Sequence, residues 1–303
     1  MKIPPIIHKL YSPLNNKQNT KASFAYYNED TLDISFQAKM KELYQGFSFD
    51  VLQYISSHKN ISIQEIEGIV KKYSNDTNVE DISTYDKPDI RQPKAMVNIP
   101  FDVCSDDNNL YIQPMPKTLY LAGFKTPTLE AVVDFTAKLL HEMTHIFQSE
   151  ADDRMNAEKL CKKYFQNGVN PQKVQYTSEV MDSVFIKLEY IMTQTYLNTY
   201  NSGYKRKEER QKAFLDNYNS SIEDFIAGNI ALGLVNEKLN SSNIDYKMLL
   251  DFIVMRSNDE KEAYQNTYDF IKHFIEDDKA HVGLRIEMYD TMAQAVEKIK
   301  GNL

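Results

Sequence analysis

The chain has 303 residues, of which 42 % are hydrophobic and 26 % charged, and its formal net charge is −8 at pH 7. This composition is typical of a globular protein with a sizeable core and excludes a disordered chain. The negative charge argues against nucleic acid or an anionic membrane as the main partner. Only 9 residues are glycine, which favours long helices over a β-barrel or a dinucleotide-binding fold.

Cysteine usage and the absence of long apolar runs indicate where the protein works. The two cysteines, Cys104 and Cys161, are too few for a disulfide framework, and no Cys-x-x-Cys pair indicates a zinc ribbon. The first residues lack the apolar stretch of a signal peptide, and no run approaches the roughly 18 apolar residues of a membrane span. We therefore expect a cytoplasmic protein without a transmembrane segment.

The N-terminal part of the chain is predicted to be helical. After a polar lead-in, the apolar spacing predicts three short helices with breaks near Gly46 and Asn60. Residues 74–93 are rich in Asn, Asp and Pro and are predicted to form a loop. We place a domain boundary at the end of this loop, so that residues 1–93 form an N-terminal helical lobe.

The pattern changes to short β-prone segments after residue 94. Three of them predict a small sheet of two or three strands: Ala95–Ile99, Leu110–Ile112 and Thr118–Ala122. Thr126 and Pro127 then have the residue types of a helix start, as N-cap and first helical residue. The helix that follows is predicted to end near residues 150–153.

The rest of the chain is predicted to consist of helices. One runs to Gln166 and ends at Asn167 and Gly168, a combination typical of a helix C-terminus. A long helix is predicted from Ser178. Further helices are predicted at 205–219, 221–239, 245–256, 259–276 and 281–300.

The most specific signal is the pentapeptide His141-Glu142-Met143-Thr144-His145, within an apolar run of helical spacing. Residues four apart lie on one face of a helix, so the two histidines can offer two imidazoles to one metal ion. Glu142 is then placed to act as general base toward a metal-activated water. Two structural histidines in a helix buried on one side are the alternative interpretation.

A catalytic zinc takes three protein ligands and keeps one position open, so a third ligand is needed. No histidine follows the motif until His273, which leaves carboxylates as candidates. We predict Glu179 as the third ligand, with Glu158 as the alternative and Glu189 as a weaker one. Asp182, one turn after Glu179, could hydrogen-bond a ligating histidine.

The segment Leu139–Gln148 resembles the active-site helix of the zincin metallopeptidases. The spacing of Glu179 and Asp182 loosely resembles the Glu-x-x-x-Asp helix of the gluzincin branch, one residue shorter. Residues 118–171 are similar to SprT-like metallopeptidases, including those of bacteriophages. That family places its third histidine near Met155 and often carries a Cys-rich ribbon, and this chain has neither feature. The resemblance implies Zn²⁺ as cofactor and an edge strand that pairs with an extended peptide.

These observations predict an α+β fold that is predominantly α, with a zincin-like core at residues 94–200 and a C-terminal helical region at 201–303. The predicted function is zinc-dependent hydrolysis of a peptide or protein substrate. The alternative is a non-enzymatic structural or interaction protein on a degenerate zincin scaffold, with a protein partner bound through the C-terminal helices. A weaker alternative keeps the metal but acts on other amides or esters. No nucleic acid or membrane partner is expected.

Overall fold

The computed structural model describes residues 29–58, 61–82, 94–106, 108–122, 129–150, 156–201 and 243–301 except 273 and 275, together with residues 209, 212, 213, 216 and 217. The fold is α+β and predominantly α, as predicted. Its contacts form two compact units. The first unit comprises Met1–Pro100, Pro116–Arg154 and Asn266–Lys279, and the second comprises Phe101–Met115, Met155–Gln265 and Ala280–Leu303. The three domains predicted from the sequence stay a prediction.

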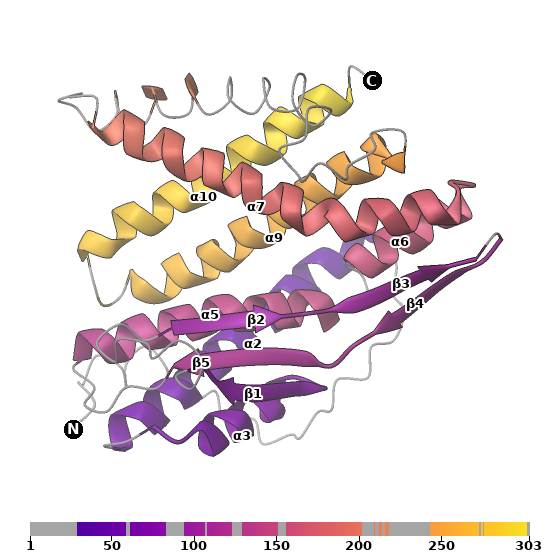
Figure 1. The fold of residues 1–303 in the computed structure, drawn as a ribbon. Helices are drawn as coiled ribbons and strands as arrows, with labels where there is room; N and C mark the ends of the chain where they lie inside the picture. Colours follow the sequence, from indigo (N-terminus) through magenta and orange to yellow (C-terminus); the bar gives the residue numbers. More distant parts are fainter. Residues whose placement is uncertain are drawn as a thin grey trace. The chain divides into compact units, whose positions relative to one another are not determined.

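A three-stranded mixed sheet lies in the first unit, in the order β1-β5-β2 (Figure 1). The central strand β5 (Lys117–Ala122) pairs in parallel with β1 (Thr77–Asp81) and antiparallel with β2 (Lys94–Asn98). The prediction of a loop at 74–93 is wrong where β1 lies. The strand buries few side chains, and its pairing with β5 joins residues distant in sequence, which a local pattern does not reveal.

The predicted break at Gly46 is also wrong, because α2 (Glu29–Ser57) continues through it. A Cβ at Gly46 would lie 3.1 Å from the Tyr73 hydroxyl oxygen, so this glycine lets α2 approach α3 (Ile63–Tyr73) closely. A glycine inside a helix costs about 1 kcal/mol relative to alanine. Packing offsets this cost, since the Phe47 and Tyr73 rings meet edge to face at 5.5 Å.

The helix that carries the motif, α5 (Leu129–Glu150), packs against β2 and α2 within the first unit. Phe147 contacts Tyr44 and Phe47 of α2, with ring centroids 5.4 and 6.4 Å apart. The predicted end of the helix is confirmed. There the Glu150 carboxylate accepts hydrogen bonds from the Asn75 backbone and from Lys117, both at 2.9 Å. The predicted helix start at Thr126 and Pro127 lies outside the described residues.

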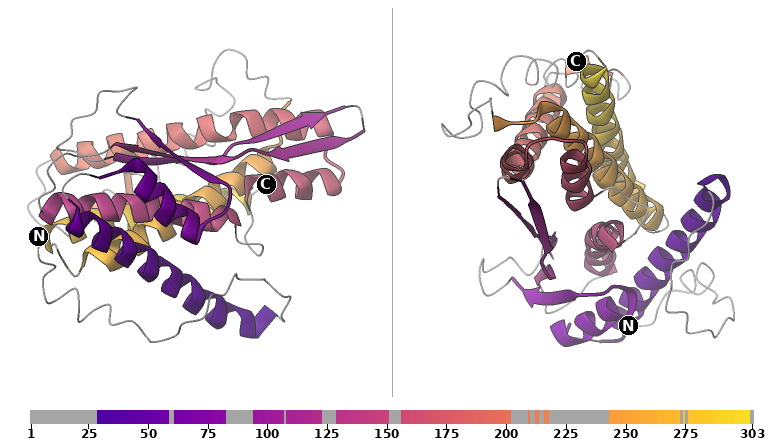
Figure 2. Two further views of the ribbon diagram at one scale, coloured as in Figure 1. Left: turned by 90° about the horizontal axis from the view of Figure 1, so that it is seen from below. Right: turned by 90° about the vertical axis from the view of Figure 1, so that its right-hand side faces the viewer.

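The second unit combines a β-hairpin with helices. Strands β3 (Phe101–Ser105) and β4 (Leu110–Pro114) pair antiparallel, and β3 was not predicted. The hairpin lies along α6 (Ala157–Gln166) and α7 (Pro171–Asn201), and α9 (Tyr246–Ile271) runs beside α10 (Glu276–Lys300) (Figure 2). One core cluster joins these elements, including Leu160, Val184, Leu188, Met248, Ile253, Met292 and Val296.

Two predicted helix boundaries in this unit are corrected. Helix α7 begins at Pro171 rather than Ser178, where Asn170 Oδ1 accepts a hydrogen bond from the Gln172 backbone (2.9 Å) in a proline-at-N1 start. Helix α9 is continuous where two helices were predicted. The end of α6 is confirmed, with Gly168 at φ 86°. The helices predicted between 205 and 239 lie mostly outside the described residues.

No helix in the described ranges combines the length and the apolar character needed to cross a membrane.

Candidate metal centre

His141 and His145 lie on consecutive turns of α5, and the structure brings their rings together. The ring centroids are 5.0 Å apart, and the rings meet edge to face at 85°. His145 is buried, with 6 % of its surface exposed, whereas His141 is half-buried. The four-residue spacing therefore produces the shared face that two ligands of one ion need.

The ring of His145 is held by a neighbour on its own helix. Its Nδ1 atom lies 2.9 Å from the Oε1 atom of Gln148, three residues later, and both side chains are buried. Thr144, between the two turns, donates its hydroxyl to the Leu140 carbonyl (2.8 Å), which satisfies that buried polar group inside the helix. The polar side chains of this part of α5 are thus tied to defined partners.

Glu142 points toward the sheet and contacts strand β2. Its Oε2 atom accepts a hydrogen bond from the backbone N–H of Val97 at 2.9 Å. Val97 pairs with Leu119 of β5, and because its N–H donates to Glu142, this pair is a non-hydrogen-bonded pair whose N–H faces the outer edge of β2. The carboxylate therefore lies between the motif helix and an edge strand.

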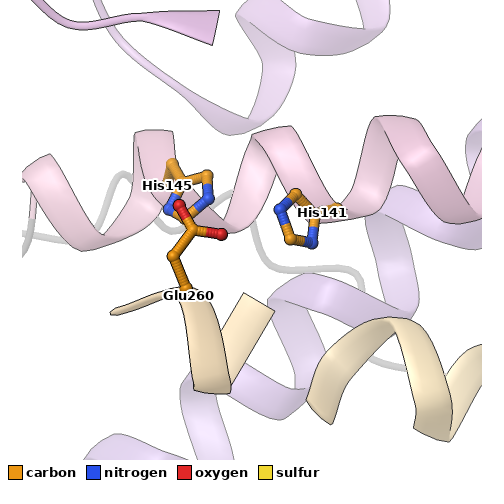
Figure 3. Close-up of side chains that lie close together, drawn as sticks. All are labelled: His141, His145 and Glu260. Carbon is orange, nitrogen blue, oxygen red and sulfur yellow. The ribbon is translucent and has the colours of Figure 1, made fainter. Parts of the chain in front are cut away.

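One group of His, Cys, Asp and Glu side chains in the described residues could hold a metal ion: His141, His145 and Glu260. Each offers one ligand atom, and these atoms all lie within 4.8 Å of one another. Figure 3 shows the Glu260 carboxylate directed toward the histidines. Less than two turns after Glu260, Asn266 donates to the Thr144 hydroxyl oxygen (3.3 Å), and this contact joins the end of α9 to α5.

Glu260 was missed from the sequence, although a signal existed. It lies on the buried stripe of α9, between Ser257 and Ala263, which have none of their surface exposed. A glutamate in such a stripe is rarely buried without a partner. The predicted candidates, Glu158, Glu179 and Glu189, all lie on the two helices that follow the motif, whereas Glu260 lies on α9.

Glu260 has a charged neighbour in the second unit. It is 8 % exposed, and its Oε1 atom lies 3.4 Å from Nη2 of Arg256, one turn earlier on α9. The Arg256 guanidinium also lies over the Phe185 ring at 5.5 Å. Burial alone would lower the pKa of Arg256, but Glu260, Asp259 and Asp182 raise it, so the side chain stays charged.

Glu189 is a second carboxylate in this unit, and it is half-buried. Its Oε1 atom accepts a hydrogen bond from the Tyr289 hydroxyl at 2.5 Å. Burial raises the pKa of Glu189, and the nearby charge of Glu260 raises it further, although the Tyr289 hydrogen bond acts in the opposite direction. Glu189 is not a member of the three-residue group.

The structure does not bring the predicted ligands Glu179 and Glu158 into the group with the two histidines. Glu179 and Asp182 are exposed on α7. Glu158 lies on α6, where it forms an ion pair with Lys162 one turn later. Met155 lies outside the described residues.

Comparisons with protein-family models, with curated proteins and with solved structures found no match for this chain. The resemblance to zincin metallopeptidases therefore depends on the pentapeptide and its surroundings.

Proposed function

We propose that this protein is a zinc-dependent peptidase in which His141, His145 and Glu260 bind the metal and Glu142 is the general base. The observation that carries the proposal is the grouping of two imidazoles and one carboxylate with ligand atoms within 4.8 Å of one another. Nitrogen and oxygen donors of these types suit zinc, and three protein ligands leave a fourth position open. When bound, zinc would polarise a scissile carbonyl and lower the pKa of a coordinated water.

The donor set fits such an ion with a modest adjustment. Zinc–nitrogen and zinc–oxygen bonds of about 2.0–2.1 Å in a tetrahedron place donor atoms about 3.4 Å apart. The group, at up to 4.8 Å, would therefore have to contract by about 1 Å or more. Small rotations of three side chains can supply a contraction of this size.

Glu142 has the position that a general base needs. It follows the first histidine directly, and the hydrogen bond from the Val97 N–H to its Oε2 atom fixes the carboxylate beside the motif helix. The carboxylate would take a proton from the attacking water and return it to the leaving amine. The outer edge of β2, beside this carboxylate, offers backbone groups that an extended peptide can pair with. This edge favours peptides over other amides or esters as substrates.

A second candidate is a non-enzymatic protein that uses the same scaffold for structure or interaction. Two observations favour it: the Glu142 carboxylate already has a backbone partner in β2, and His145 is only 6 % exposed. Under this proposal a bound metal would stabilise the fold without turnover.

The two candidates are separated by hydrolysis of fluorescein-labelled casein by the zinc-loaded full-length protein. We expect the wild type to cleave casein and E142Q to lose turnover while it keeps its zinc. The matched control is E65Q, because Glu65 is an exposed carboxylate on α3 of the same unit. Equal cleavage by wild type and E142Q would refute the assigned role of Glu142. A zinc-loaded wild type that cleaves no peptide would favour the second candidate.

A further inference from the structure

We infer that Gln148 is a positioning residue that fixes the tautomer of His145, so that Nδ1 carries the proton and Nε2 presents its lone pair to the metal. This inference rests on the proposed metal site. Its basis is the 2.9 Å contact between Nδ1 of His145 and Oε1 of Gln148. Only 6 % of His145 and 5 % of Gln148 is exposed, so water competes little for this contact.

The contact between the His145 ring and the Gln148 amide can exist in two states, which differ in the ring nitrogen that carries the proton. A neutral imidazole has one N–H donor and one acceptor nitrogen. An amide oxygen only accepts, so its contact with Nδ1 requires the proton on Nδ1. If the amide were turned over, its NH₂ group would donate to Nδ1, and the proton would lie on Nε2. The second state would block Nε2 as a metal ligand.

The partner of His145 is a neutral glutamine rather than a carboxylate, and this affects the charge of the site. Metal-ligating histidines commonly donate their second nitrogen to a carboxylate or a carbonyl oxygen, which fixes the orientation of the ring. A glutamine does this without adding charge. The carboxylate of Glu260 already supplies one negative charge to the group. Gln148 therefore orients His145 while the net charge of the site stays low.

Two substitutions separate orientation from packing. Q148L keeps a side chain of similar size and removes the acceptor, so we expect about a 10- to 100-fold loss of zinc affinity. Q148E restores an acceptor at the same place and should keep the wild-type affinity or exceed it. The control is D134N, which removes one partner of the exposed Asp134–Lys138 ion pair on the same helix.

The direct experiment is long-range ¹H–¹⁵N NMR of the metal-free, ring-¹⁵N-histidine-labelled protein at pH 8, with His145 assigned from the H145A spectrum. We expect the Nδ1–H tautomer in the wild type and a mixture of tautomers in Q148L. An Nε2–H tautomer in the wild type would overturn the inference, whether or not the protein binds zinc.

Zinc affinity, measured by competition with a chromophoric chelator, completes the test. A wild type that binds zinc while Q148L binds it equally well would overturn the role of Gln148 and leave the metal site intact. A wild type that binds no zinc would overturn the proposed function itself and, with it, the role of Gln148 toward a metal. Loss in Q148L with recovery in Q148E supports the inference, because a residue needed only for packing would not be rescued by a charged side chain.

Discussion

Replacement of Glu260 by glutamine should abolish tight metal binding and leave the fold almost unchanged. The substitution keeps the shape of the side chain in its buried position and removes the negative charge that a divalent ion would bind. The same substitution at Glu179, the ligand predicted from the sequence, should have no effect on affinity, because the structure places that residue on an exposed face of α7.

The size of each effect follows from the surroundings of Glu260. Loss of a residue that only orients a ligand costs about 10- to 100-fold in metal affinity. Loss of a direct ligand should exceed about 100-fold, or about 2.7 kcal/mol. The ion pair between Glu260 and Arg256 is long, at 3.4 Å, and the two side chains are 11 % and 32 % exposed. Nearby carboxylates would still compensate the Arg256 charge in E260Q, so the loss of the pair should cost well below the roughly 3–5 kcal/mol of a buried charge left uncompensated. Relief of the repulsion between Glu260 and Glu189 would reduce that cost further.

The assay pairs chelator competition for zinc with urea unfolding of the metal-free protein, for wild type, E260Q, E179Q and E158Q. We expect only E260Q to lose affinity, with an unfolding curve close to that of the wild type. If E179Q or E158Q lost zinc and E260Q kept it, the third ligand proposed from the structure would be wrong. If E260Q were unfolded without metal, the ion pair between Glu260 and Arg256 would be more important to the fold than its length indicates.

Two further predictions concern the second unit. Burial alone would raise the pKa of Asp251, but hydrogen bonds from Lys300 (2.6 Å) and Tyr164 (2.8 Å) hold it below its ordinary value. The carboxylate thus stabilises the fold above about pH 4, and this stabilisation is lost as the pH falls. The free energy of unfolding, measured with urea between pH 6 and pH 3, should therefore depend less on pH in D251N than in the wild type. An unchanged pH dependence in D251N would contradict this prediction. Burial raises the pKa of the Cys161 thiol to about 12, whereas Cys104 is exposed. Dithionitrobenzoate should therefore label Cys104 quickly and Cys161 only when the protein unfolds. Equally fast labelling of both thiols would contradict the packing of α6.

Much of the local structure around the motif could be predicted from the sequence. The apolar spacing of α5, its end near Glu150 and the shared face of His141 and His145 follow from the geometry of a helix, which depends on neighbouring residues alone. The strands β2, β4 and β5 were also predicted, because short β-prone segments are separated by turns that contain proline and asparagine.

The features that the sequence did not predict depend on contacts between distant segments. Strand β1 exists through its pairing with β5, and α2 continues through Gly46 because Tyr73 packs there. Glu260 lies more than a hundred residues after the motif, and its grouping with the histidines is a feature of the three-dimensional structure alone. No local pattern around residue 260 contains that information. The sequence offers only one indication of a role for Glu260, which is its position within the apolar stripe of α9.

The most direct test of the metal site is the metal content of the purified full-length protein, measured by inductively coupled plasma mass spectrometry for wild type and H145A. We expect about one zinc per chain in the wild type and none in the folded H145A variant. A folded wild type that holds no metal, even after zinc is added and excess is removed, would contradict the proposed site and leave His141 and His145 as structural residues of α5.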